Sequence, residues 1–490
     1  MATQAHETGG LGLERRVIGL PTALGTTFSL IVATSVLSTV AGGFFASYVW
    51  LVALAIALVT MYLAAMSFSE LATMIPKAGS MNEYVRAGLG PFFATVTVLV
   101  GYIAIQLFPG SAEAFAGSFI TADVLGAPGD FKLWVIVFVG FLTVINLAGI
   151  RPFAALEVFL TFAVAGSLLV IGFIGLVGIG SSDPLGSALP HFDFTWSLLS
   201  SLLGLAIFTF VGVEYTCPLA EELKRPARDI PVGILGGLGL IAVAVVLYGL
   251  GAARYLPGDA LASLSPTIPV DYGQAVLGDG GKWWMGIVTI FAMLGTLNAV
   301  LAGVPRILYG MALTRQLPSA FGYLLPATRA PAVGIVLMAL APILMNVFDQ
   351  TPAKGSFIEL ILAGVLGWAT AYFLIHLSQV ALRLREPNAK RPFRSPLFPV
   401  VQLAGMGLLA LAAFKIFPDP TIRDHIYRDY GIFLACAVAF SLVYNLYAYK
   451  NLATIFRPVP LAEVYQETEE ISEHLPLEVE PGGPHIHHDT

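Results

Sequence analysis

Residues Phe208–Glu214 read Phe-Thr-Phe-Val-Gly-Val-Glu, which places a glycine and an acidic side chain within a long apolar run. Glycine weakens a helix, and a carboxyl group inside a membrane is costly unless it faces the protein interior. Transport proteins tolerate unwound backbone where it lines a cavity, because the freed N–H and C=O groups can bind a polar solute. The stretch therefore predicts a helix that is broken around Gly212, with Glu214 beside the break.

The rest of the chain has the composition of an integral membrane protein. Of its 490 residues, 57% are apolar and only 11% are charged, and the mean hydropathy is +0.81. A soluble domain carries about 25% charged residues, so most of this surface must face lipid. The apolar runs are long and continuous, which favours α-helical spans of about 20 residues over the short alternating strands of a membrane barrel.

Apolar runs bounded by charges, Gly and Pro predict an all-α membrane protein with about twelve transmembrane helices. The predicted spans are Pro21–Ala41, Tyr48–Ser69, Phe92–Gly110, Leu133–Leu147, Pro152–Ile179, Trp196–Leu219, Ile230–Ala253, Trp283–Leu308, Ala332–Phe348, Phe357–Leu382, Leu397–Phe417 and Tyr430–Tyr449. Residues 1–20 form a predicted cytoplasmic N-terminal segment, and 21–454 are predicted to form the transmembrane domain. Residues 455–490 are acidic and polar, which predicts a disordered cytoplasmic tail.

The distribution of Lys and Arg predicts the orientation. With the N-terminus in the cytoplasm, 18 of the 25 basic residues fall at cytoplasmic span ends and 7 at outer ends. Cytoplasmic loops normally carry this excess. We therefore expect an even number of spans in the plasma membrane, with both termini in the cytoplasm. The polar leader lacks the features of a secretory signal, so we expect no cleaved peptide.

Several other classes of protein are disfavoured. A net charge of −6 without a basic run gives no indication of a nucleic-acid partner, and no Walker-type phosphate loop is present. Cys217 and Cys436 lie inside apolar stretches and do not indicate a disulfide framework. His376 stands nearly alone within the spans, so neither a membrane enzyme nor a bound cofactor is expected. We interpret the His cluster at 485–488 as part of a solvated tail rather than a metal site.

Few other polar groups lie within the spans. Glu113 follows Pro109–Gly110 near the outer end of the third span, and Thr296 and Asn298 lie in the eighth. The first span carries a series of hydroxyls: Thr26, Thr27, Ser29, Thr34, Ser35, Ser38 and Thr39. Such groups either face a polar pathway or are packed, with hydroxyls bonded to their own helix. For Glu113 both interpretations remain open, whereas for Glu214 and for the hydroxyls as a group a functional role is favoured.

A short internal match points to a repeat. Leu24–Gly25 opens one apolar run and Leu203–Gly204 opens another, 179 positions later. The same offset places Ala33–Ser35 opposite Gly212–Glu214. Corresponding interruptions in two halves of a transporter indicate a substrate site at the repeat interface.

Four stretches together resemble the amino acid–polyamine–organocation (APC) superfamily of permeases. They are Ser69–Ser80 with Tyr84, Arg86 and Gly90–Pro91; Phe210–Glu214 with Glu221–Pro231; Gly295–Asn298 with Arg306, Tyr309, Ala312 and Leu317–Pro318; and Leu382–Pro387 with Arg391–Phe393. The resemblance implies a LeuT-like fold. Helices one to five (about 21–179) and six to ten (about 196–382) would form inverted repeats, with two extra helices at about 397–449.

The resemblance also implies a site between the broken first and sixth helices. Ala33, Thr34 and Ser35 would offer backbone or hydroxyl groups to a carboxylate. Phe210, Val211 and Gly212 would offer carbonyls to an ammonium group. Phe208 matches an aromatic residue that covers the substrate, and Glu214 matches an acidic residue linked to gating or protons. Glu113 and Asn298 complete the predicted substrate-binding set.

The sequence departs from the family pattern in two places. The first break reads Ala33–Leu37 without glycine, which weakens the prediction of carboxylate recognition, because glycine lets backbone approach a ligand closely. The fifth span, Pro152–Ile179, contains no Lys, so the lysine-based proton coupling of some relatives is excluded. Coupling must then use another group such as Glu214, or the protein is an exchanger or a facilitator.

The sequence as a whole predicts a secondary active transporter that moves a small amino acid or amine by alternating access, coupled to protons or by exchange. Glu113 and Glu214 together lead to the hypothesis that the substrate is a cationic amine. The alternatives are a facilitator or channel and a solute sensor without transport. No channel filter sequence is evident. The expected partners are the small-molecule substrate, protons and the lipid bilayer.

Overall fold

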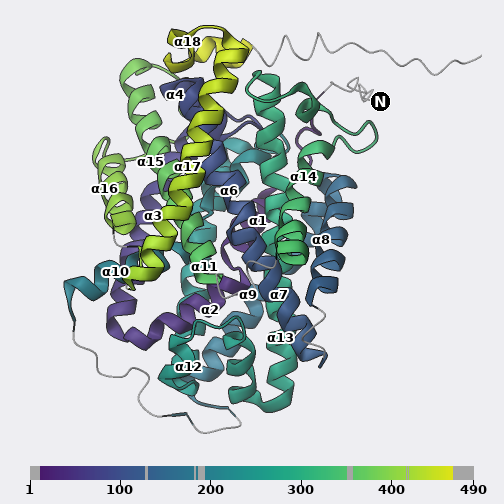
Figure 1. The fold of residues 1–490 in the computed structure, drawn as a ribbon, viewed down its shortest axis with the longest axis vertical. Helices are drawn as coiled ribbons and strands as arrows, with labels where there is room; N and C mark the ends of the chain where they lie inside the picture. The colour runs from purple at the N-terminus through teal and green to yellow at the C-terminus, as the bar shows by residue number, and fades with distance from the viewer. Residues whose placement is uncertain are drawn as a thin grey trace, which may run out of the picture.

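The computed structural model describes residues 12–126, 131–180, 184–185, 194–349, 357–414, 416–417 and 419–466. Within these residues the regular structure is helical, apart from one isolated bridge between Ile18 and Leu223. Eight described helical runs are long and apolar enough to cross a membrane, and a ninth candidate is a bent pair. Three shorter apolar helices coincide with the remaining predicted spans. The all-α membrane fold predicted from the sequence is therefore confirmed (Figure 1).

The spanning elements follow the predicted order. They are α1 (Leu20–Ile31) with α2 (Thr34–Gly43), α3 (Tyr48–Met74), α5 (Pro91–Val98) through α6 (Ala104–Leu107) to α7 (Pro109–Val124), α8 (Phe131–Leu147), α9 (Ile150–Val177), α10 (Trp196–Phe208) with η4 (Val213–Leu219), α11 (Pro226–Tyr255), α13 (Ile268–Leu313), α14 (Ala332–Ile343), α15 (Phe357–Arg385), α16 (Val400–Phe414) and α17 (Pro420–Tyr449). Shorter helices are α4 (Met81–Leu89), α12 (Gly258–Ala262) and α18 (Leu452–Phe456). Two helices begin ten or more residues before their predicted spans: α17 extends through the polar residues that precede its apolar run, and α13 includes an earlier helical stretch joined to it across a kink at Leu277 and Gly278.

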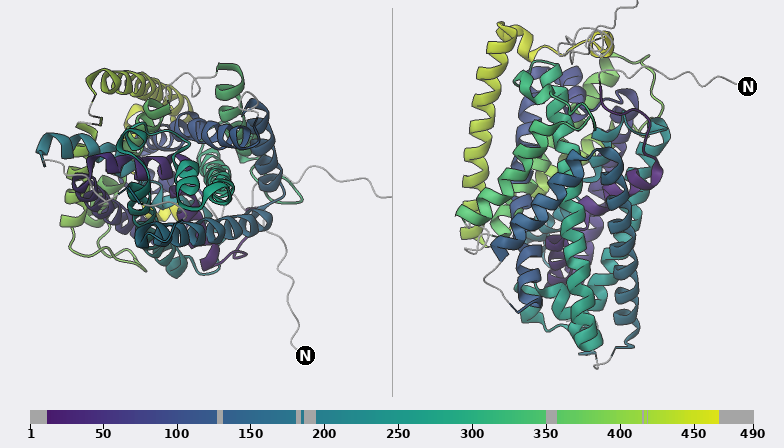
Figure 2. Two further views of the ribbon diagram at one scale, coloured as in Figure 1. Left: turned by 90° about the horizontal axis from the view of Figure 1, so that it is seen from below. Right: turned by 90° about the vertical axis from the view of Figure 1, so that its right-hand side faces the viewer.

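The first span lies at the centre of the bundle. α1 packs against α9, α11, α13 and η4, so it is enclosed on several sides. The last two spans lie at the edge, where α16 contacts α15 and α3, and α17 contacts α15 and α5. Figures 1 and 2 show α17 running along the outside of the bundle. This arrangement places the interrupted helices where their free backbone groups are shielded from lipid.

The distribution of side chains suits a lipid environment. Large apolar residues are exposed on the outer helices, for example Val144 on α8, Phe162 on α9 and Val443 on α17. Carboxyl groups are instead buried inside the bundle, as at Glu113 and Glu214. A soluble protein would show the reverse arrangement. The buried polar groups therefore mark the part of the interior that can interact with a polar solute.

The described part of the C-terminal segment is packed. Ile455 and Val464 are fully buried, and the Tyr465 hydroxyl donates to the carbonyl of Met74 at 2.7 Å. The Lys77 ammonium donates to the carbonyl of Val464. The tail predicted to be disordered from residue 455 therefore includes twelve ordered residues, 455–466, because apolar side chains anchor them. The His cluster at 485–488 lies outside the described residues.

Candidate functional site

The first span is broken between α1 and α2, and the two helices meet at an angle of 59°. α1 ends at Ile31, Ala33 is extended (φ −83°, ψ 160°), and α2 begins at Thr34. The carboxylate of Glu113, from α7, accepts hydrogen bonds from the backbone N–H of Thr34 at 2.6 Å and of Ser35 at 3.0 Å. The first N–H groups of a helix have no partner within the helix. Glu113 therefore supplies the cap that holds this break.

The second break follows α10 and confirms the predicted interruption around Gly212. The helix ends at Phe208, and Gly212 has φ +103°, a conformation that L-residues with a side chain rarely adopt. A Cβ atom here would meet the side chain of Leu30. The Gly212 N–H donates to the Tyr372 hydroxyl at 2.9 Å, and that hydroxyl donates in turn to Glu214. Tyr372, on α15, was not among the predicted residues.

Hydrogen bonds tie the two broken spans together. The Thr216 hydroxyl, on η4, donates to the carbonyl of Ala23 at 2.8 Å and lies 3.0 Å from the hydroxyl of Thr27. Closer to the end of the bundle, the N–H groups of Val17 and Ile18 donate to the carbonyl of Glu222 at 2.7 and 3.0 Å. The α1 half of the first span and the η4 half of the sixth are thus linked by backbone and side-chain contacts. A movement of α1 is expected to involve η4.

A cavity lies against both breaks. Its wall combines apolar residues with one carboxylate and is formed by Leu30, Ile31, Ala33, Ser35, Val36, Ile105, Pro109, Gly110, Glu113, Phe208, Val211, Thr296, Val300 and Trp368. A mostly apolar pocket with a few polar groups is the usual form of a small-molecule site. Five residues predicted to bind substrate are in this wall: Ala33, Ser35, Glu113, Phe208 and Val211.

The other predicted residues lie at the breaks or away from the cavity. Thr34, Phe210 and Gly212 belong to the two breaks but not to the wall, and the Thr34 hydroxyl donates to the carbonyl of Thr289 at 2.9 Å. Glu214 points to Tyr372. Asn298 is not in the cavity wall, and its side-chain amide instead interacts with another buried carboxyl group.

That carboxyl group is Glu157 on α9, which the sequence analysis did not select. Asn298 donates to its Oε2 at 2.7 Å, and the Asn146 side chain donates to the side-chain amide oxygen (Oδ1) of Asn298 at 2.9 Å. Nearby, the hydroxyls of Ser29 and Thr161 lie 2.9 Å apart. The signal was available, because Glu157 is an acidic residue inside a predicted span. Glu157 and these neighbouring side chains form a buried polar cluster between α1, α8, α9 and α13.

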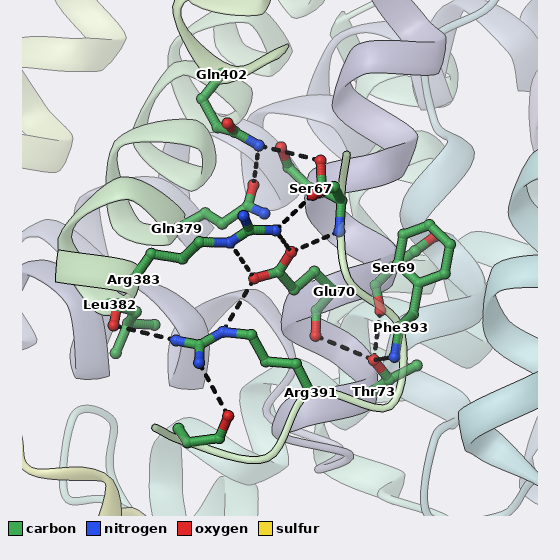
Figure 3. Close-up of polar contacts among 12 residues, drawn as sticks. Ser67, Ser69, Glu70, Thr73, Gln379, Leu382, Arg383, Arg391, Phe393 and Gln402 are labelled. Atoms are coloured by element: carbon green, nitrogen blue, oxygen red, sulfur yellow. Dashed lines mark hydrogen bonds and ion pairs between the residues drawn. The ribbon is translucent and has the colours of Figure 1, made fainter. Parts of the chain in front are cut away.

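Residues of the four family-like stretches meet at one end of the bundle. Glu70, in the first stretch, contacts Arg383 and Arg391 of the fourth, with 3.1 Å between its Oε1 and the Arg391 Nε. Figure 3 shows the Glu70 carboxylate between these two guanidinium groups. Glu222, in the second stretch, forms a bidentate pair with Arg306 of the third at 2.6 and 2.9 Å. These ion pairs therefore hold helices together, whereas Val211 and Thr296, which belong to the second and third stretches, are in the cavity wall.

Residues 19–449 match the family model described as amino acid permease. The serine/threonine exchanger SteT of Bacillus subtilis is 25% identical over 373 residues, covering 73% of this chain and 80% of SteT. The branched-chain amino acid permease BcaP of the same organism is 23% identical, with coverage of 79% and 83%. The methylthioribose transporter of Bacillus subtilis is 25% identical, and the match covers 79% of this chain and 83% of that transporter.

A solved structure with a similar fold is that of Mhp1, a nucleobase-cation-symport-1 family transporter in a closed conformation with bromovinylhydantoin bound. The TM-score is 0.56 at 15% sequence identity, and the match covers 94% of this chain and 99% of that one. This likeness supports the LeuT-like arrangement predicted from the sequence. The family match over most of the chain shows that this multi-pass membrane protein is a transporter of the amino acid permease family in the APC superfamily.

Proposed function

We propose that the protein is a secondary active transporter that moves a small amino acid or amine across the plasma membrane by alternating access. The observation that carries the proposal is the cavity between two broken helices, with the carboxylate of Glu113 in its wall. Free backbone groups at such breaks recognise polar solutes, and rocking of one helix bundle against the other exposes the site to each side in turn. The relatives named for amino acids support this substrate class.

Glu214 is the proposed gating or proton-carrying residue. Its carboxyl group is fully buried and bonded to Tyr372, whose hydroxyl also accepts from the N–H of Gly212. A change in the protonation or the partner of Glu214 would therefore reach the second break directly. Phe208 and Val211 belong to the wall on the same side. We place both termini in the cytoplasm, as the excess of basic residues indicates.

The decisive experiment is uptake by purified protein in proteoliposomes. Radiolabelled amino acids and amines are supplied with an inward proton gradient in one arm and with unlabelled internal solute in the other. Saturable uptake driven by the proton gradient supports proton coupling, and uptake that requires internal solute supports exchange. Downhill flux with neither requirement supports a facilitator. Ligand binding without any flux would contradict the transport proposal and leave a solute sensor.

A further inference from the structure

We infer that the substrate is a small organic amine without a carboxylate group, because Glu113 occupies the backbone N–H groups that would otherwise bind such a group. The inference rests on the proposed transport function and narrows its substrate class. The sequence alone raised a cationic amine as a hypothesis from two acidic residues. The structure adds a specific reason, which is the position of one of those carboxylates.

The start of α2 is already occupied by an anion. The N–H groups of Thr34 and Ser35 both point to Glu113, one to each carboxylate oxygen. The preceding N–H, of Ala33, donates to the carbonyl of Ile31 at 2.9 Å. Half-helix N-termini are where transporters of this architecture bind anionic substrate groups. Here three successive N–H groups at that position have partners within the protein.

The charge of the cavity disfavours a second anion. Glu113 is only 1% exposed and lies in the wall, and the described wall residues include no Lys, Arg or His. A substrate carboxylate would therefore lie near a like charge, in surroundings where water screens poorly, without a positive side chain in that wall to offset it. The ammonium group of an amine would instead find an opposite charge.

The same wall can hold the rest of an amine. Each carboxylate oxygen of Glu113 can accept a second hydrogen bond, so the cap on α2 persists while an ammonium group binds. Phe208 and Trp368 contribute aromatic rings to the wall, and aromatic faces attract cations. Leu30, Ile31 and Val211 supply apolar contact for a short carbon chain. Glu113 thus acts as the specificity-determining residue.

Matched pairs of ligands test the inference. Each pair is an amino acid and its decarboxylated counterpart: serine and ethanolamine, valine and isobutylamine, lysine and cadaverine, arginine and agmatine. Affinities are measured from the stabilisation of detergent-solubilised protein by each compound, and uptake is measured in proteoliposomes. We expect one or more amines to bind at least about 100-fold more tightly than their amino acid partners, as expected when like charges are juxtaposed.

Variants of Glu113 assign the preference to this residue. Glu113→Ala removes the charge and frees both N–H groups, so the preference within the responsive pair should fall at least about tenfold, through weaker amine binding and stronger amino acid binding. Glu113→Gln removes the charge with little change in size and should weaken amine binding. Glu157→Gln is the matched control, because it neutralises another buried carboxyl group outside the cavity wall; it should leave the preference unchanged. Size-exclusion profiles confirm that each variant is folded.

The outcomes separate this inference from the transport proposal. Wild-type protein that binds and carries an amino acid at least as well as its amine partner would overturn the inference and support transport. A folded Glu113→Ala variant with an unchanged preference would also overturn it, since the cap would then have a structural role alone. Uptake of neither member of any pair would contradict the transport proposal, and the inference with it.

Discussion

The break between α1 and α2 and the break between α10 and η4 adjoin the same cavity but are held by different groups. In the first, no residue has a positive φ, and a carboxylate from α7 caps the free N–H groups. In the second, Gly212 at φ +103° makes the turn, and a tyrosine hydroxyl from α15 accepts its N–H. One break therefore depends on a tertiary contact and the other on the backbone freedom of one residue.

The comparison suggests different roles for the two breaks. The cap places an acidic side chain at the first break, in the wall of the cavity, and we propose that it selects the kind of solute that binds there. The tyrosine at the second break connects Gly212 to Glu214, a group whose proton or partner can change. We therefore propose that the first break determines selectivity and that the second determines gating. Substitutions at each break can test this division.

The largest effect is expected at Gly212. In Gly212→Ala, a Cβ atom must adopt a left-handed conformation and also meets the side chain of Leu30. Backbone strain of this kind costs about 1–3 kcal/mol, and the close contact adds to it. We expect a loss of more than about 3 kcal/mol in the free energy of unfolding and no uptake, as measured by thermal unfolding in detergent and by proteoliposome assays.

A glycine within a regular helix provides the control for this substitution. Gly166 lies inside α9, and apart from its chain neighbours and the nearby backbone of its own helix, no described atom lies within 4 Å of a Cβ built on it. Gly166→Ala should be neutral or more stable by up to about 1 kcal/mol, because alanine favours helix. If the two variants lost equal stability, the special conformation of Gly212 would not explain the second break.

The difference between a local break and one held by a distant residue explains which parts of the site could be predicted from the sequence. Gly212 and Glu214 lie next to each other in an apolar run, so local chemistry predicts the second break. The twelve apolar runs likewise predict the helices, because lipid contact requires them. The cap at the first break joins Ser35 to Glu113, 78 positions apart, and no local pattern signals that contact. The pairs of Asn298 with Glu157 and of Gly212 with Tyr372 were missed for the same reason.

The next effect concerns the cap itself. Glu113→Ala leaves two buried N–H groups without an acceptor, and loss of a helix cap costs about 0.5–2 kcal/mol. We expect a decrease of about 2 kcal/mol in the free energy of unfolding. Glu113→Gln should lose less, because its amide oxygen still accepts one hydrogen bond. An alanine variant as stable as the wild type would show that the first break holds without the carboxylate.

A smaller effect is expected for the hydroxyl of Tyr372. Tyr372→Phe removes the acceptor of the Gly212 N–H and a donor to Glu214, and a lost buried hydrogen bond costs about 1–2 kcal/mol. We also expect slower uptake with little change in ligand affinity, since this contact lies outside the cavity wall. Tyr248→Phe is the matched control, because the Tyr248 hydroxyl is buried without a hydrogen-bond partner among the described residues. If Tyr248→Phe slowed uptake as much as Tyr372→Phe does, the proposed gating role of the contact between Tyr372 and Glu214 would be wrong.

The smallest effect is expected where the two broken spans meet. Thr216→Val keeps the shape of the side chain but removes the hydroxyl that bonds to the carbonyl of Ala23 and contacts Thr27. The cost should be about 1 kcal/mol. Thr60→Val is the control, because among the described residues the Thr60 hydroxyl bonds only within its own helix, to the carbonyl of Ile56 at 2.8 Å. If α1 and η4 move together during transport, Thr216→Val should lower the uptake rate more than its small loss of stability explains, and Thr60→Val should not. Equal uptake by both variants would mean that α1 and η4 do not move together through this contact. The two breaks would then respond independently of each other during transport.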